Sequence, residues 1–140
     1  MHNLAVKEIM TTALVTVNTN DPVSRVAQIF NQHRFHHIPI VDNAGCIAGI
    51  ISLSDFERIK NGQTLFRNPK IEAYNNALFQ TMLAQDMMTR DVVELRPTDP
   101  IQRAYEIFKD NKFRALPVVD KGTLQGIVTP LDILDHFFKN

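Results

Sequence analysis

Apolar residues follow one pattern twice along this chain. A glycine, two β-branched apolar residues and a hydroxyl residue precede an aspartate in GIISLSDF over 49–56. The same order returns near the C-terminus as GIVTPLDI over 126–133. A short apolar run that ends at a hydroxyl residue predicts a buried strand that leads directly into a helix. We therefore expect two related strand–helix corners.

The other apolar and polar positions repeat in the same register. Residues 10–42 align with residues 88–120 without a gap, and the matches resume after one deletion in the following turn. So many matches in order indicate an internal duplication. We assign a first repeat to 1–60, a linker to 61–84 and a second repeat to 85–140. Because a unit of about 60 residues buries only a marginal core, the repeats are expected to pack on each other.

Each repeat carries the signals of a β-α-β-β-α order. Short runs of β-forming residues at 14–17 and 92–95 open the repeats. The Asp-Pro pairs at 21–22 and 99–100 predict helices with aspartate as the N-cap and proline at the first helical position. Two strands and a last helix follow. The expected fold class is α+β, with a three-stranded sheet in each repeat.

The linker combines loop signals with a helical pattern. Apolar residues recur at helical spacing over 71–84, so we expect a helix there. Such a helix either covers one edge of the core or presents an interaction surface to a partner or a second subunit. The sequence leaves both interpretations open.

Charge and composition argue against several functions. The 15 basic residues balance the 15 acidic ones, so the chain lacks the net positive charge that supports general nucleic-acid binding. No apolar run approaches the ~20 residues that a membrane span needs, so we expect a soluble, cytoplasmic protein without a membrane partner. The single cysteine, Cys46, excludes an internal disulfide and a zinc site built from several thiolates.

The repeated segments resemble a known family. MTTALVTV to IISLSDF over 10–56 and MTRDVVEL to IVTPLDI over 88–133 resemble two consecutive cystathionine-β-synthase (CBS) domains, which together form a Bateman module. The resemblance implies two CBS repeats packed about a pseudo-twofold axis, with two clefts between them. In similar proteins these clefts hold AMP, ADP, ATP or S-adenosylmethionine, and the modules pair into flat homodimers.

This resemblance implies a function without catalysis. The chain is expected to be a regulatory module that senses an adenine nucleotide, requires no cofactor and signals in trans to an unidentified effector protein. No Ser-His-Asp order, glycine-rich phosphate loop or metal-hydrolase motif supports an enzyme.

The resemblance also implies which residues contact the ligand. Ser52 with Asp55, and Thr129 with Asp132, fall on the nucleotide motif, in which the aspartate accepts hydrogen bonds from the ribose hydroxyls. Arg114 falls where related modules place a phosphate-contacting basic residue, and His36 is its counterpart in the first repeat. The expected set of ligand contacts is completed by two neighbouring residues, His37 and Ala115.

Three alternatives stay open. A hydroxyl residue three positions before an acid at a helix start also forms a capping box, worth about 1 kcal/mol, without any ligand. A dimeric scaffold with empty clefts would likewise carry the motif. His33, His36 and His37 could ligate zinc, but His36 and His37 point to opposite sides if the strand has begun, and no second group of ligands lies nearby. Loop histidines beside a ligand cleft are the preferred interpretation.

Overall fold

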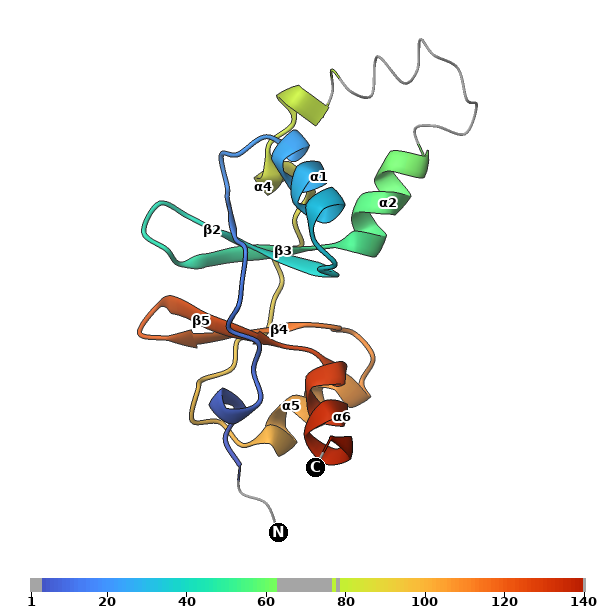
Figure 1. Ribbon diagram of the computed structural model, residues 1–140. Coiled ribbons are helices and arrows are strands. Elements are labelled where there is room, and N and C mark those ends of the chain that lie inside the picture. The colour runs from blue at the N-terminus through green and yellow to red at the C-terminus, as the bar shows by residue number, and fades with distance from the viewer. Residues whose placement is uncertain (1–3, 63–76, 78, 140) are drawn as a thin grey trace. The chain divides into compact units, whose positions relative to one another are not determined.

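The computed structural model describes residues 4–62, 77 and 79–139. Half of the helix expected over 71–84, residues 71–76 and 78, lies outside these residues, and the described residues 77 and 79–81 are helical. The described chain forms two compact units (Figure 1). We call one the first-repeat unit, made of Val15–Ala44 and Ala48–Arg90. The other is the second-repeat unit, made of Met1–Leu14, Gly45–Ile47 and Asp91–Asn140.

The first-repeat unit has a sheet with helices on one face (Figure 1). The sheet has the strand order β1-β2-β3, with β1 (Val17–Asn18), β2 (His37–Val41) and β3 (Ile47–Ser52). Strand β1 runs parallel to β2. The helices of this unit include α1 (Val23–Gln32), α2 (Leu53–Gly62) and the short α4 (Ala84–Met87). Apolar residues of the sheet and helices form one core that includes Val17, Val26, Ile29, Ile40, Ile51 and Phe56.

The second-repeat unit pairs β4 (Leu116–Asp120) with β5 (Thr123–Val128) in antiparallel fashion. Helices α5 (Ile101–Lys109) and α6 (Pro130–Phe138) lie on one face of this pair (Figure 1). A 3-10 turn, η1 (Val6–Glu8), precedes them in the chain. The core of this unit includes Val6, Leu95, Ala104, Leu116, Val118, Val128 and Ile133.

The expectation of a three-stranded sheet in each repeat is wrong for the second repeat. Leu95 makes one parallel bridge, to Val118, in place of a third strand. In the first repeat the ladder continues because the Thr19 N–H donates to the Val41 carbonyl at 3.0 Å. The aligned residue in the second repeat is Pro97, which has no N–H to donate.

The expected aspartate caps are also wrong. Helix α1 begins at Val23 with Pro22 as its N-cap, so Asp21 lies one residue too early to reach the free N–H groups of the first turn. Asp21 Oδ2 instead accepts a hydrogen bond from the Asn18 N–H at 2.9 Å and closes the preceding turn. The second repeat repeats this arrangement with Pro100 as the cap and a 2.8 Å bond from the Arg96 N–H to Asp99.

A Met-Thr segment extends the sheet of each unit. Thr11 and Ile127 of β5 exchange backbone hydrogen bonds of 2.8 and 3.0 Å. Thr89 and Ile50 of β3 do the same at 2.9 and 3.1 Å. The opening segment of the first repeat therefore belongs to the sheet of the second-repeat unit, and the opening segment of the second repeat belongs to the sheet of the first-repeat unit.

Two glycines allow these segments to approach closely. A Cβ atom on Gly49 would lie 2.6 Å from the Thr89 carbonyl oxygen, and one on Gly126 would lie 2.9 Å from the Thr11 carbonyl oxygen. Both distances are shorter than normal carbon–oxygen contacts. The glycine that opens each repeated motif therefore leaves the space that the backbone of the Met-Thr segment needs to pack against it.

No helix among the described residues combines the length and apolar character needed to cross a membrane.

Candidate functional site

The residues predicted to contact a ligand lie at two strand–helix corners, one in each unit. The first corner joins the end of β3 to α2, beside the start of β2, and contains His36, His37, Ser52 and Asp55. The second corner joins the end of β5 to α6, beside the start of β4, and contains Arg114, Ala115, Thr129 and Asp132.

In the first corner the hydroxyl caps the helix and the carboxylate points elsewhere. Ser52 Oγ accepts the Asp55 N–H at 3.0 Å, which is one half of a capping box. The Leu53 N–H donates to the His36 carbonyl at 2.8 Å and holds the start of β2 against the corner. Asp55 Oδ1 accepts a 3.0 Å hydrogen bond from Arg58, whose side chain is 76% exposed. An ion pair that exposed contributes little to stability and is readily exchanged for another partner.

The two histidines differ in exposure. His36 is exposed, whereas His37 begins β2 and is half-buried. The described residues contain no group of three or more His, Cys, Asp or Glu side chains that could hold a metal ion.

In the second corner the carboxylate is held by three donors. Asp132 Oδ2 accepts the Thr129 N–H at 2.9 Å and the Thr129 hydroxyl at 3.3 Å. Asp132 Oδ1 accepts the Thr11 hydroxyl at 3.0 Å. In this half of a capping box, the Asp132 side chain reaches back to the N–H of the cap residue Thr129. The first corner has the other half, in which the cap hydroxyl accepts the N–H of the acid. A carboxylate has about four lone-pair positions, so Asp132 keeps little free acceptor capacity unless a ligand displaces a hydroxyl.

The strand register brings the remaining second-corner residues to the same place. Leu116 pairs with Val128, so Ala115 and Thr129 are the next residues outward on neighbouring strands. Ala115 is buried and Arg114 is exposed. Within the described part of the chain, the Arg114 side chain makes no hydrogen bond or ion pair. It therefore offers a free guanidinium near the carboxylate-bearing corner.

Thr11 is a residue of the second corner that the sequence did not identify. The available signal was the Met-Thr pair, which opens both aligned segments at 10–11 and 88–89. The corners differ because the residue three positions after the aspartate is Arg58 in the first repeat and Asp135 in the second. An aspartate at that place cannot attract Asp132, which turns to the threonine donors instead.

Comparison with known protein families matches the CBS domain twice, over residues 6–61 and 84–139. The chain belongs to the CBS domain family. The predicted membership and the predicted mixed fold of two CBS repeats are therefore confirmed.

Related CBS sequences occur within longer proteins. The uncharacterized protein MJ1225 of Methanocaldococcus jannaschii is 26% identical over 136 residues, which cover 96% of this chain and 48% of that protein. This chain thus spans about half the length of that relative. A homoserine O-acetyltransferase of Methanococcoides burtonii is 28% identical over 130 residues, which cover 92% of this chain and 23% of the enzyme.

Two solved CBS structures contain adenosine compounds. The CBS domain pair of protein MJ0100, in complex with 5′-methylthioadenosine and S-adenosyl-L-methionine, is 26% identical, with a TM-score of 0.74 and 97% of each chain covered. CBSX2, in complex with AMP, is 22% identical, with a TM-score of 0.76 and 96% of each chain covered. The second likeness concerns the fold alone.

Proposed function

We propose that this CBS pair is a regulatory module that binds an adenine nucleotide or S-adenosylmethionine at its two corners. Asp55 and Asp132 accept hydrogen bonds from the ribose hydroxyls in this proposal. Ser52 and Thr129 lie beside them. Arg114 contacts phosphate in the second corner, and His36 takes the same part in the first.

The observation that carries this proposal is the convergence at the second corner. The ends of two paired strands place a carboxylate, a hydroxyl and an arginine without a described partner at the start of one helix. The guanidinium of an arginine presents a fork of N–H donors to phosphate oxygens. The hydroxyls of a ribose donate hydrogen bonds that a carboxylate accepts. The two ligands of the MJ0100 CBS domain pair share an adenosine group, which supports the same ligand class.

We further propose that the module forms a homodimer and signals to a separate effector protein by changing the surface it presents. Helix α6 supports the dimer because it exposes the large apolar side chains of Leu131, Leu134, Phe137 and Phe138 by 51 to 81%. Apolar side chains gathered on one short helix mark a surface that another molecule covers.

A ligand-free scaffold is the second candidate. The three hydrogen bonds to Asp132 favour it, because they explain the aspartate of the second corner as a helix cap.

A thermal-shift panel separates the two candidates. AMP, ADP, ATP and S-adenosylmethionine are each added with and without Mg²⁺. The nucleotide-binding proposal predicts that at least one raises the melting temperature, because a ligand at 100 times its Kd adds about 2.7 kcal/mol to the stability. If none of them stabilises the protein at millimolar concentration, the scaffold is supported and the nucleotide proposal fails.

A further inference from the structure

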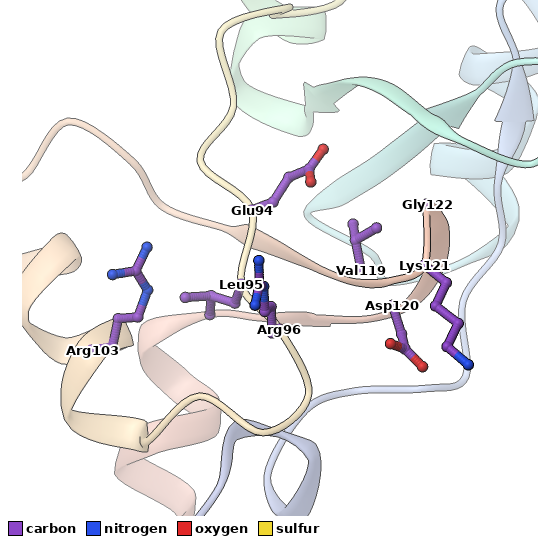
Figure 2. A pocket seen from close by; sticks show the side chains of 8 residues that line it. All are labelled: Glu94, Leu95, Arg96, Arg103, Val119, Asp120, Lys121 and Gly122. Atoms are coloured by element: carbon purple, nitrogen blue, oxygen red, sulfur yellow. The ribbon is translucent and has the colours of Figure 1, made fainter.

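A second candidate ligand site lies within the second-repeat unit, outside the second corner. It is a cavity of about 660 Å³. Figure 2 shows its charged side chains: Arg96 and Glu94 come from the segment before α5, Arg103 comes from α5, Asp120 ends β4, and Lys121 lies in the turn between β4 and β5. Its volume lies in the range of small-molecule sites, roughly 300–1,000 Å³.

The charges of this cavity are mostly unpaired. Arg103 Nε lies 3.4 Å from Asp99 Oδ2, so its charge is partly balanced. Among the described residues, the side chains of Arg96, Asp120 and Lys121 have no hydrogen-bond or ion-pair partner. Leu95 is fully buried, so alternation along the segment turns Arg96 away from the core.

The first repeat uses the aligned positions differently. Asn18 takes the place of Arg96, and its Nδ2 donates to Asn43 Oδ1 in the β2–β3 turn at 2.8 Å. The turn also uses the Asp42 carboxylate, which accepts the Ala44 N–H at 2.9 Å. The side chains at these positions of the first repeat are therefore bonded to each other or to the turn itself.

The second repeat has replaced this closed arrangement with an open one. Arg96 and Lys121 carry donors only, so they cannot bond to each other as Asn18 and Asn43 do. Both side chains line the cavity and are positively charged, so together they favour an anionic ligand there. Asp120 beside Lys121 would repel a bare anion, so a favourable ligand must also bring hydroxyl donors for this carboxylate.

We propose that this cavity binds a small phosphorylated ligand that carries hydroxyl groups. Arg96 and Lys121 contact the phosphate, and Asp120 accepts hydrogen bonds from the hydroxyls. This site shares no residue with the two corners, so the proposal does not depend on nucleotide binding at the corners.

The test uses ribose 5-phosphate as the probe and the full chain with Asp55→Ala and Asp132→Ala, so that the corners do not contribute. Binding is followed by calorimetry and by the NMR shift of the Gly122 amide, which lines the cavity. The double substitution Arg96→Asn and Lys121→Asn gives the second repeat the two asparagines that bond to each other in the first repeat, Asn18 and Asn43. Lys121 has a φ of 51°, which asparagine adopts readily, so the turn should be preserved.

We expect this double substitution to lower the affinity for ribose 5-phosphate by about tenfold or more for each cation removed. Replacing two exposed lysines elsewhere in the unit, Lys109→Gln and Lys112→Gln, changes the net charge equally and should leave the affinity unchanged. No binding to the starting protein, an unchanged affinity after the asparagine substitutions, or an equal loss in the lysine control would each overturn the proposal.

Asp120→Asn tests the hydroxyl contact with inorganic phosphate as the second probe. Removing the negative charge should raise the affinity for inorganic phosphate. The affinity for ribose 5-phosphate should fall relative to the affinity for inorganic phosphate. An equal gain for both probes would overturn the assignment of Asp120 to the hydroxyls.

Discussion

The aspartates at equivalent positions of the two repeats have different neighbours, and this difference begins with single residues. Asp55 lies in the first turn of α2 and bonds only the exposed Arg58 among the described side chains. Asp132 lies in the first turn of α6 and accepts three hydrogen bonds from threonines. Asp132 therefore contributes to the fold itself, whereas Asp55 is free to exchange its partner for a ligand.

The hydroxyl of Thr11 should have a measurable effect on stability. Thr11→Val keeps the side-chain shape but removes the donor to Asp132, so the free energy of unfolding should fall by about 1–3 kcal/mol, since the acceptor is charged. Urea denaturation measures this change. The matched control is Thr89→Val, which removes the aligned hydroxyl without breaking a described bond to Asp55. Equal losses for the two variants would contradict the assigned role of Thr11.

The elements of each unit depend on close backbone packing at the motif glycines. Gly49→Ala places a methyl group 2.6 Å from the Thr89 carbonyl, and Gly126→Ala places one 2.9 Å from the Thr11 carbonyl. Overpacking of this kind costs about 1–3 kcal/mol, and the tighter contact should cost more. We expect both variants to unfold at lower urea than the parent, with Gly49→Ala the less stable. A neutral effect at Gly49 would show that the Met-Thr segment is not seated there.

The sequence predicted the elements better than their ends. The apolar run before each hydroxyl residue correctly indicated a strand that leads into a helix, because burial and the helix start are encoded locally. The Asp-Pro pairs misled because aspartate can close the preceding turn as well as cap a helix. The loss of the third strand depends on Pro97 and could have been inferred only from its alignment with Thr19.

The candidate site was predictable only in part for the same reason. The motif indicated Ser52, Asp55, Thr129 and Asp132 because each lies beside its partner in sequence. Thr11 lies far from Asp132 along the chain, and only the folded sheet brings the two together. The bond between Asn18 and Asn43 likewise depends on a turn meeting a strand, which no local pattern shows.

For the whole molecule, we expect a homodimer that depends on α6. Phe137 and Phe138 are 55 and 81% exposed, so replacing both with serine should not disturb the core. Light scattering at micromolar concentration should show a dimer for the parent and a monomer for this variant. Lys139→Ser, at the adjacent residue, serves as the control and should remain dimeric. A monomeric parent, or a variant that stays dimeric, would contradict the role of this helix.

The central claim is that the two aspartates bind the ribose of an adenine nucleotide, and calorimetry tests it most directly. AMP is titrated into the parent, Asp55→Ala, Asp132→Ala and the double variant, with the unfolding of each measured alongside because Asp132 also caps α6. Asp135→Ala, which removes an acid that pairs with the exposed Lys139, is the control. We predict that each aspartate substitution weakens its own site by about tenfold to a hundredfold, that the double variant loses both sites, and that the control binds as the parent does. A folded double variant that binds AMP as tightly as the parent would contradict the claim and leave both aspartates as structural residues.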